Sequence, residues 1–504
     1  MIYSKGRGYS MAKSYNETTR RKILTGNIWS VVLSITLPLF LYQLFNSLYS
    51  LIDAIMLVNI STTASSAGAL LAQVKTMISS LGGGISSGAA ILISRKYGAG
   101  DIESAKKYAN VMFTIELVII SIILLVFIPL AEPIMRLCGC NDEIVNISKG
   151  YFRLQLVEQC IICLNNVFLA TEKSKGNTKI IFIGNIIMMG IKLSLNALFV
   201  YGIKIDDMIY VELASIISQL FLFIMGAFFM FNKKNIFRIH YKNFSLDKEY
   251  SKKILIISLP LFLGKFVISL GKVTVNAICA TFIEGDKLLV GALGVSNNIC
   301  GLITNPGNAI EDSESSIVSQ NLGNRNMKRS MKVFITSVIV IFIWSFIGFI
   351  CVRFLFLDQI VNLFTTAEAV SQTYKELIKG IFYYDCLSIP SLAVNAVILG
   401  LLYGYGQTIL ATINNLVRIA TRIGVLLICK VTMDTSNLEN AAKAAGLSMG
   451  ISNVVIATFV TIILLIFLIK TKRKGYKGMH FTDPEPEMIE VDGILVRKDS
   501  IKEA

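Results

Sequence analysis

Twelve long apolar segments dominate the sequence, and they restrict the chain to one class of fold. A bilayer core is crossed by about 20 apolar residues in helical conformation, and each segment is at least that long. The chain is 54% hydrophobic and only 16% charged, whereas about a quarter of the residues in soluble domains are charged. The sequence therefore predicts an all-α polytopic membrane protein with 12 transmembrane helices. The segments lie at roughly 28–57, 66–97, 108–131, 144–172, 178–203, 208–232, 250–282, 289–321, 330–357, 374–402, 406–431 and 440–470.

Lysine and arginine gather in alternate loops, and this pattern sets the expected orientation. Basic clusters follow the second, fourth, sixth, eighth and twelfth segments, whereas the intervening loops are neutral or mixed. The positive-inside rule places the basic loops and both termini in the cytoplasm. We therefore expect a multi-pass protein of the cell membrane (plasma or inner). Topology accounts for the net charge of +15, so no nucleic-acid partner is expected. No cleavable signal peptide is expected either, because the first 30 residues lack an apolar core.

The sequence also repeats itself at a nearly constant offset. LPLFL occurs at 37–41 and again at 259–263, an offset of 222. Gly98 in RKYGAGDIESAKK matches Gly323 in QNLGNRNMKRSMK at an offset of 225. Two further pairs continue the series at an offset of 230, namely Gly176 with Gly406 and Asn185 with Asn415. Because each half has an even number of spans, the repeat is parallel, and such halves enclose a central cavity and rock against each other.

The repeat divides the chain into two pseudo-symmetric bundles of six helices. Each bundle, or lobe, carries six of the apolar segments, and charged segments flank them. The predicted divisions are a cytoplasmic arm at 1–27, an N-lobe at 28–232, a basic cytoplasmic linker at 233–249, a C-lobe at 250–470 and a cytoplasmic tail at 471–504.

The first apolar segment carries a polar face that ends in an acid. Gln43, Asn46, Tyr49 and Asp53 recur at steps of three, three and four, which places them on one side of a helix. A carboxylate at such depth is costly and suggests a functional site. The alternative is a polar seam that only joins helices. Pro38 removes a backbone hydrogen bond from this helix and permits a bend.

The second and eighth segments are interrupted by residues that disfavour regular helix. The second contains the glycine triplet 82–84, and the eighth contains Pro306-Gly307. Such interruptions occur where a helix lines a cavity or bends. Close helix packing through small residues explains the triplet equally well.

At these motifs the sequence resembles the multidrug and toxic compound extrusion (MATE) transporters, part of a wider superfamily that includes lipid-linked oligosaccharide and polysaccharide flippases. The resemblance covers roughly 25–470, and five motifs carry it in order: Pro38, Gln43 and Asp53 in the first span, ISRKYGAGDIESAKK from Ile93, KGNTK from Lys175, SLPLFL from Ser258 and VSQNLGNRNMKRS from Val318. It implies two six-helix lobes in a V shape and export driven by a proton or sodium gradient. It also implies that Asp53 couples the ion.

The fifth span departs from the pattern of that family. Bacterial members often carry N-x-x-x-D or N-x-x-x-N there, whereas this chain has Lys192 before Asn196. The equivalent position in the other half is Arg422, one turn after Arg418. Two interpretations remain open. Either these cations pair with carboxylates, for example Lys192 with Asp53, and favour proton coupling, or they bind an anionic group of the substrate. Snorkelling is a third, purely structural possibility.

Together these patterns define the candidate site. Asp53 is the expected ion-coupling residue, and no catalytic or metal-binding residue is expected because both histidines, His240 and His480, lie outside the spans. The N-lobe cavity candidates are Gln43, Asn46, Tyr49, Asn185, Lys192 and Asn196. The C-lobe cavity candidates are Glu311, Glu314, Asn415, Arg418 and Arg422.

The expected function is secondary-active export of small molecules by alternating access, coupled to inward movement of H+ or Na+. The alternative is a flippase or exporter of an anionic or lipid-linked amphiphile; a large basic cavity with a lateral opening would favour it, and a mixed or acidic chamber would favour drug export. An integral-membrane enzyme is disfavoured because no loop is long enough for a catalytic domain. The expected partners are a small-molecule substrate and the lipid bilayer, with no cofactor besides the transported ion and a monomeric state.

Overall fold

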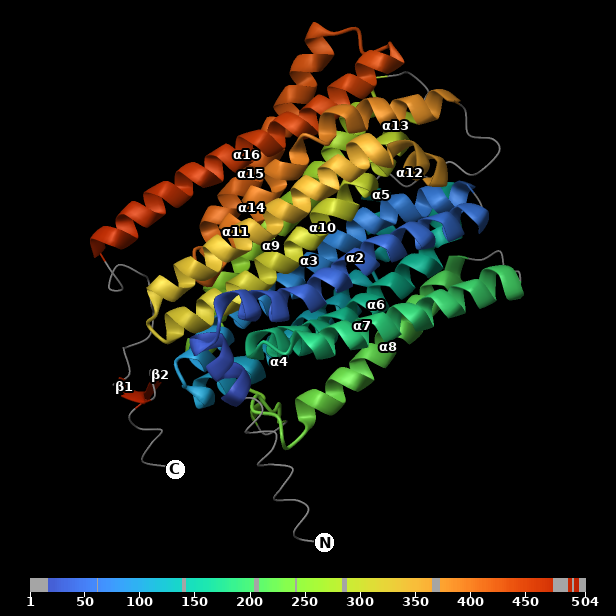
Figure 1. Cartoon of the computed structure of the whole chain (residues 1–504). Coiled ribbons are helices and arrows are strands. Elements are labelled where there is room, and N and C mark those ends of the chain that lie inside the picture. The colour runs from blue at the N-terminus through green and yellow to red at the C-terminus, as the bar shows by residue number, and fades with distance from the viewer. Residues whose placement is uncertain are drawn as a thin grey trace.

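The computed structural model describes residues 17–60, 62–137, 142–203, 208–240, 243–282, 288–364, 372–474, 488–491 and 494–497. Long helices make up nearly all of this part, and they lie side by side in two groups (Figure 1). The blue-to-green helices form the N-lobe, and the yellow-to-red helices form the C-lobe. The predicted all-α architecture with two six-helix bundles is thereby confirmed.

The helix boundaries follow the predicted spans to within a few residues. In the N-lobe the elements are α2 (Ile28–Ile60), α3 (Thr62–Gly98), α4 (Ile102–Ile122), the π-helical turn η1 (Ile123–Phe127), the short α5 (Ala131–Leu137), α6 (Asp142–Lys175), α7 (Thr178–Ala197), η2 (Leu198–Gly202) and α8 (Met208–Phe231). In the C-lobe they are α9 (Lys248–Cys279), α10 (Leu288–Gly323), α11 (Met327–Ile350), η4 (Cys351–Leu355), α12 (Leu357–Phe364), α13 (Gln372–Asp385), α14 (Ser388–Gly404), α15 (Thr408–Thr432) and α16 (Leu438–Lys474).

Not every helix is apolar enough to cross a membrane unaided. Ten helices within the described ranges meet that condition by length and composition. The tenth predicted span is broken into α13 and α14, which meet at 50° and together make an eleventh. The remaining predicted span, α10, is more polar because it carries asparagines and acids along its length. It packs against α2, α3, α11, α13 and α14, and several of its asparagines line a cavity, so polar groups of this helix have surroundings other than lipid.

The turns that precede α7 and α15 have the same backbone. Gly176 and Gly406 both adopt φ of +78°, a left-handed conformation that glycine takes at no steric cost. Asn177 and Gln407 follow them as the residues preceding α7 and α15. The two glycines match at an offset of 230 in the sequence, so the repeat extends from sequence to backbone geometry.

The loops after α3 and α10 repeat each other in the same way, although their residues differ. Gly100 has φ of +81°, and Arg325, which matches it at the offset of 225, has φ of +55°. The next residues cap the following helices: Asp101 accepts from the backbone N–H of Ser104 at 3.1 Å, and Asn326 accepts from that of Arg329 at 2.9 Å. Among the described residues, Arg325 is the non-glycine residue with a left-handed backbone conformation. This conformation costs about 1–2 kcal/mol for an L-residue.

The two lobes touch most closely where α3 and α10 cross. A Cβ atom on Gly98 would overlap the carbonyl oxygen of Gln320, and one on Gly323 would overlap that of Arg95. These two contacts are equivalent under the offset of 225, so a pseudo-two-fold axis passes between them. The glycines leave no room for a side chain and allow the helix ends to meet.

The glycine triplet in α3 is also a packing device. A Cβ on Gly84 would lie 2.8 Å from the Phe262 Cβ of α9, and one on Gly82 would lie 2.7 Å from the Cys163 Sγ of α6. The middle residue, Gly83, has more space around it. Of the two explanations for this triplet, the described contacts favour close packing, both across the lobe interface and within the N-lobe.

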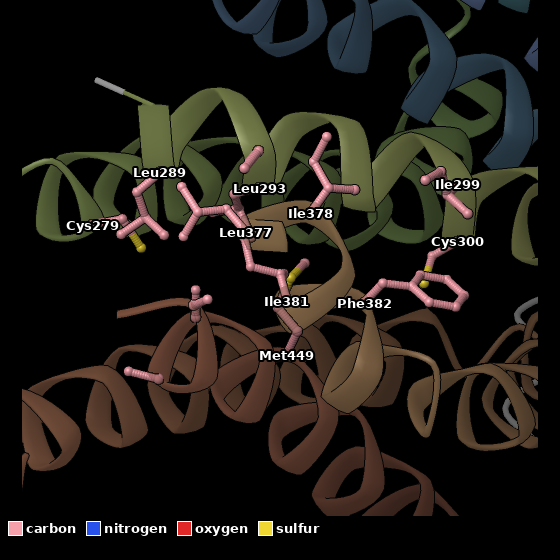
Figure 2. Close-up of a cluster of buried hydrophobic side chains, with 14 of the residues drawn as sticks. Cys279, Leu289, Leu293, Ile299, Cys300, Leu377, Ile378, Ile381, Phe382 and Met449 are labelled. Atoms are coloured by element: carbon pink, nitrogen blue, oxygen red, sulfur yellow. The ribbon is translucent and has the colours of Figure 1, made fainter. Parts of the chain in front are cut away.

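An apolar cluster fixes the broken span of the C-lobe. Figure 2 shows side chains from α9, α10, α13 and α16 meeting in one layer. Ile378, Ile381 and Phe382 of α13 are fully buried there. Burial of such side chains stabilises by about 1.5–3 kcal/mol each, so α13 is held firmly even though it ends halfway along the lobe. Asp385, the last residue of α13, is thereby placed at the break.

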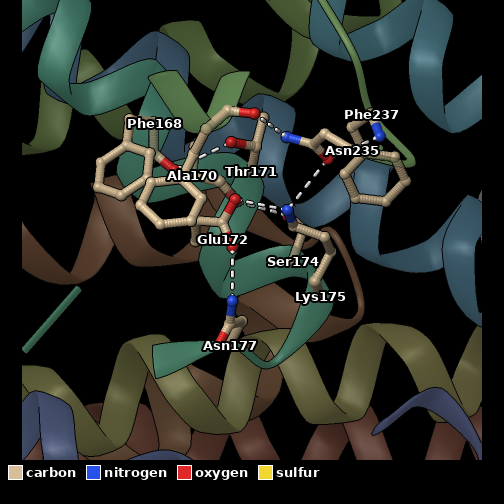
Figure 3. A network of polar contacts seen from close by, with 10 residues as sticks. Phe168, Ala170, Thr171, Glu172, Ser174, Lys175, Asn177, Asn235 and Phe237 are labelled. Carbon is tan, nitrogen blue, oxygen red and sulfur yellow. Dashed lines mark hydrogen bonds and ion pairs between the residues drawn. The ribbon is translucent and has the colours of Figure 1, made fainter. Parts of the chain in front are cut away.

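The inter-lobe linker is bound to the N-lobe and is not a loose tether. Lys175 at the end of α6 contacts Glu172 at 2.5 Å and Asn235 at 3.2 Å, and Asn177 donates to Glu172 at 2.9 Å (Figure 3). Phe237 is fully buried beside this network. The network joins the turn between α6 and α7 to the start of the linker.

The C-terminal tail contains two short strands that the sequence analysis did not anticipate. β1 (Met488–Val491) and β2 (Ile494–Arg497) pair antiparallel, with Met488 opposite Arg497. This hairpin lies outside both lobes (Figure 1) and leaves the helical architecture of the spans unchanged.

Candidate functional site

The first span places its predicted polar residues along α2, but only part of that face is described. Gln43 and Asn46 are half-buried. The side chains of Tyr49 and Asp53 lie outside the described residues, so the ion-coupling role of Asp53 stays a prediction. Ser47, next to Asn46, accepts a hydrogen bond of 2.9 Å from Asn305 of α10. The polar side of α2 therefore reaches the lobe interface.

A network of buried charges occupies the interior of the N-lobe. Lys75 of α3 forms an ion pair with Glu158 of α6, and its Nζ lies 3.8 Å from Oε1 of Glu212 on α8. The two glutamate side chains are only 5% and 3% exposed, and they are close enough to interact electrostatically with each other. Lys192 of α7 attracts both of them. Four helices thus contribute two lysines and two carboxylates, a combination that keeps buried charges paired. We name these four residues the N-lobe charge network.

The other N-lobe candidates lie near this network or serve the helix itself. Asn196, one turn after Lys192, is fully buried. Asn185 is also buried, and its side chain donates to the carbonyl oxygen of Ile181 in its own helix at 2.8 Å. The Asn185 side chain is therefore hydrogen-bonded within its own helix, whereas Lys192 acts electrostatically on the carboxylates of the network.

Sequence reasoning missed two buried acids of the N-lobe. Glu212 was not recognised because it stands alone in an apolar segment, and its partners come from distant segments of the chain. Glu116 of α4 is fully buried and lies against the Gly82 position and Cys163. A single carboxylate within a predicted span is itself the signal that could have identified both residues.

Between the lobes lies a first cavity of about 180 Å³. Its wall combines hydroxyls of α3 with charged groups of both lobes: Ser86, Ser87, Lys173, Lys265, Glu311, Asp312 and Tyr403 are among the lining residues. Lys173 of α6 bridges the lobes through an ion pair of 2.6 Å with Asp312 of α10. This pair is positioned to hold the two lobes together on the side where α3 and α10 cross.

A second cavity, of about 420 Å³, lies within the C-lobe. It is lined by α9, α10, α13, α14, α15 and α16, and it shares Lys265, Glu311 and Tyr403 with the first cavity. The two cavities are therefore adjacent, and these three side chains stand where they meet. We name this space the C-lobe cavity.

Four of the five predicted C-lobe residues lie on the wall of this cavity: Glu311, Asn415, Arg418 and Arg422. The fifth, Glu314, is fully buried next to Gly400 of α14 and does not line it. A step of three residues along α10 turns Glu314 toward α14 and leaves Glu311 on the cavity side.

Fixed hydrogen bonds position the deepest charges of the C-lobe cavity. Arg422 is 4% exposed, and it donates to Ser452 Oγ at 3.2 Å and to Asn453 Oδ1 at 3.5 Å. Asp385 at the break between α13 and α14 accepts a bond of 3.0 Å from Ser388 Oγ. Arg418 lies one turn before Arg422, and Lys272 reaches the same space from α9. Lys272 and Asp385 were not among the predicted site residues.

Several known proteins share this architecture. The MatE family model matches residues 38–198 and 260–428. The chain is 21% identical over 322 residues to the multidrug export protein MepA of Staphylococcus haemolyticus, covering 63% of this chain and 70% of that protein. It is 21% identical over 356 residues to a protein of Shewanella oneidensis named FAD transporter, covering 70% and 77%.

Solved structures give the same fold. An outward-facing multidrug resistance MATE family transporter of the MOP superfamily aligns with a TM-score of 0.81 at 20% identity, over 90% of this chain and 98% of that one. A MOP superfamily transporter from Pyrococcus furiosus, described as having a binding pocket of reverse polarity, aligns with a TM-score of 0.82 at 20% identity and the same coverage. Because the family model matches both lobes and most of the described spans, the chain belongs to the MatE family of multi-pass membrane transporters.

Proposed function

We propose that this chain is a secondary-active exporter of small molecules that works by alternating access. The observation that carries the proposal is the pair of adjacent polar cavities, one between the lobes and one inside the C-lobe, enclosed by helices of membrane length. Charged side chains around a cavity in the middle of a bundle do little to stabilise the fold, because burial of charge is costly. It is expected where a solute passes.

The contacts between the lobes support the alternating-access part of the proposal. The lobes meet tightly where Gly98 and Gly323 cross, and the basic loops that follow these residues are expected on the cytoplasmic side. A chamber closed at that end presents its contents toward the other side. Rocking about the pseudo-two-fold axis would reverse this arrangement, as in other parallel-repeat transporters.

Substrate export is supported by the names of relatives, which describe those proteins and guide the choice of probes here. One relative is named a multidrug export protein, another a probable multidrug resistance protein of Bacillus subtilis, and a third an FAD transporter. These names include both xenobiotic and anionic nucleotide cargo, so both charge classes belong in the first assays.

For the coupling ion we propose H+, with the N-lobe charge network as its acceptor. Glu158 and Glu212 lie within reach of the same lysine, Lys75, and two neighbouring carboxylates respond strongly to the gain or loss of a proton. The lysine ammonium groups already stand beside the carboxylates, where a bound sodium ion would need to be. Protonation weakens the attraction between α3, α6 and α8, which is a direct route from a proton to a helix movement. Asp53 remains the acceptor predicted from the family resemblance.

Transport by inside-out proteoliposomes tests this proposal. Uptake of one cationic probe, ethidium, and one anionic probe, FMN, is measured under an acidic interior and separately under an outward sodium gradient. We expect uptake of at least one probe to follow the proton gradient. Glu212→Gln is expected to reduce the gradient-driven component at least tenfold, because the network then lacks one of its two proton-binding carboxylates.

Two further variants separate the candidate acceptors. Asp53→Asn tests the residue implied by the family, and Glu132→Gln is a matched control because Glu132 pairs with Arg136 at the surface. Full proton coupling in Glu212→Gln together with its loss in Asp53→Asn would assign the role to Asp53. Equal uptake with and without either gradient would contradict secondary-active export altogether.

A further inference from the structure

The C-lobe cavity carries more positive than negative charge, and this imbalance identifies a class of ligand. Among the described residues, its wall holds four cations, Lys265, Lys272, Arg418 and Arg422, and two carboxylates, Glu311 and Asp385. We propose that this cavity binds an organic phosphate through Lys272, Arg418 and Arg422. The inference deepens and rests on the proposed transport function, because it names the substrate class of the same passage.

The three cations converge on one space from two helices. Arg418 and Arg422 are one turn apart on α15 and therefore lie on the same face. Lys272 of α9 is close enough to repel both of them electrostatically. The Lys272 side chain is exposed although it lies inside an apolar span, and it lines the cavity. Part of this side chain is therefore not packed against other protein groups.

The protein itself neutralises this cluster only in part. Arg422 is held by the neutral groups of Ser452 and Asn453, and Asp385 is the carboxylate that attracts Arg418 and Arg422. The Nε atom of Arg418 is buried without a hydrogen-bond partner among the described residues. Three like charges around one acid leave an excess of two. Such an excess is unfavourable in an empty cavity and is relieved by a dianion.

The geometry of the donors favours phosphate over a single carboxylate. A phosphate monoester carries a charge of about −1.5 to −2 near neutral pH, which matches the excess of two, whereas one carboxylate supplies only half of it. Guanidinium groups present paired N–H donors that fit phosphate oxygens, and a lysine adds a mobile point charge. Two arginines and one lysine are therefore a suitable set of phosphate ligands.

The remaining wall describes the other part of the ligand. It is rich in amides, which can donate and accept hydrogen bonds: Asn297, Asn298, Asn305, Asn308, Asn395, Asn415 and Asn453. Tyr403 is the aromatic side chain among the described lining residues. A volume of about 420 Å³ falls within the size range of small-molecule sites. The cavity thus suits a polar body, such as a sugar or nucleoside, attached to the phosphate.

Ligand-induced thermal stabilisation of the full chain in a neutral detergent tests this assignment. The probes are AMP and FMN, each compared with its phosphate-free parent, adenosine or riboflavin. A ligand that binds the folded state raises the unfolding temperature in a saturable manner. We expect at least one phosphate ester to do so, its neutral parent to have no effect, and inorganic phosphate to compete.

Matched variants locate the site. Arg418→Gln and Lys272→Gln are each expected to weaken the apparent affinity at least tenfold, while Arg418→Lys retains part of it. Lys430→Gln is the control, because Lys430 lies on the same helix, outside the cavity, and bonds to Thr281 at 2.8 Å. Equilibrium dialysis of radiolabelled AMP or FMN checks affinity independently of folding stability. This second measurement is needed for Arg422→Gln, whose loss of two hydrogen bonds also affects the fold.

The possible outcomes are distinct. Equal stabilisation by a phosphate ester and its neutral parent, unchanged affinity in both cavity variants, or stabilisation by ethidium alone would overturn the inference. A response to dihexanoyl phosphatidic acid but not to AMP or FMN would support the phosphate site and assign it to a lipid headgroup. Because binding is measured without an ion gradient, a failure of gradient-driven uptake would leave this result intact.

Discussion

The interiors of the two lobes differ in the net charge of their buried side chains. In the N-lobe charge network two lysines, Lys75 and Lys192, face two glutamates, Glu158 and Glu212. In the C-lobe cavity Lys272, Arg418 and Arg422 face one nearby acid, Asp385. Lys192 and Arg422 occupy equivalent positions of the repeat under the offset of 230. The same scaffold thus holds a neutral network in one half and a cationic cavity in the other.

This difference indicates a division of labour. A balanced network is stable when empty and changes when a proton neutralises one member, which suits energy coupling. An unbalanced cluster is poorly stabilised when empty and favours the arrival of an opposite charge, which suits ligand binding. Substitutions in the two lobes test this division, and the variants with the strongest expected consequences come first.

The strongest contrast comes from removing one lysine in each lobe. Lys75→Gln leaves Glu158 and Glu212 buried with less compensation, so we expect a loss of about 3–5 kcal/mol in the free energy of unfolding. Lys272→Gln removes like-charge repulsion, so we expect no loss and a gain of up to about 1 kcal/mol. Reversible unfolding in mixed micelles measures both values.

A double variant provides the control for this contrast. Lys75→Met combined with Glu158→Gln removes the ion pair as a whole and should recover much of the stability lost in Lys75→Gln. Similar destabilisation by Lys75→Gln and Lys272→Gln would show that the lobes do not differ in charge balance, and the division of labour would have to be abandoned.

A second comparison tests the symmetry of the lobe interface. Gly98→Ala and Gly323→Ala each place a methyl group against a backbone carbonyl of the other lobe, so each should destabilise the closed arrangement by about 1–3 kcal/mol. Crosslinking between the ends of α3 and α10 should decrease to a similar extent in both variants. Gly190→Ala and Gly424→Ala are the controls, because nothing lies within 4 Å of a Cβ at either position. A strongly unequal effect of the two interface variants would argue against the pseudo-two-fold axis.

The weakest effect concerns the left-handed residues of the two equivalent loops. Gly100→Ala introduces strain at φ of +81°, whereas Arg325→Gly relieves it at φ of +55°. We expect changes of about 1 kcal/mol in opposite directions. Arg325→Ala separates backbone strain from loss of the side chain, because it removes the side chain and keeps the strain. Identical unfolding free energies for Arg325→Gly and Arg325→Ala would show that this backbone position is unstrained.

Much of the fold could be predicted because it depends on features that are local in sequence. The length and polarity of each segment determine which helices can cross a bilayer, and the collinear motifs at Gly98, Gly176, Gly323 and Gly406 revealed the repeat. The break between α13 and α14 was not predicted, although Asp385, Ser388 and Pro390 lie at that point of the segment at 374–402. It depends on the packing of Phe382 and its neighbours, which come from separate helices.

The site was predictable only where the repeat pointed to it. Lys192, Arg418 and Arg422 were identified because a cation within a span is conspicuous, and Arg422 because it aligned with Lys192. The partners of these cations were not identified. Glu158 and Glu212 reach Lys75 from helices far apart in the chain, and no spacing rule connects them. The sequence interpretation offered Asp53 as one example of a partner for Lys192, and this pairing stays a prediction because the Asp53 side chain lies outside the described residues. Lys192 also attracts Glu158 and Glu212.

The charge excess of the C-lobe cavity has a consequence for the energetics of the transport cycle. With four cations and two acids among the described residues of its wall, the vacant cavity has an excess of two positive charges, which the proposed phosphate dianion would cancel. A resting voltage that is negative inside acts on each uncompensated charge with about 2.3 kcal/mol per 100 mV. The voltage therefore drives the vacant, positively charged cavity toward the cytoplasmic face. It exerts little force on the loaded cavity, whose charge is cancelled. Current recordings from oriented liposomes should then show charge displacement in the return step, and displacement confined to the loaded step would refute this.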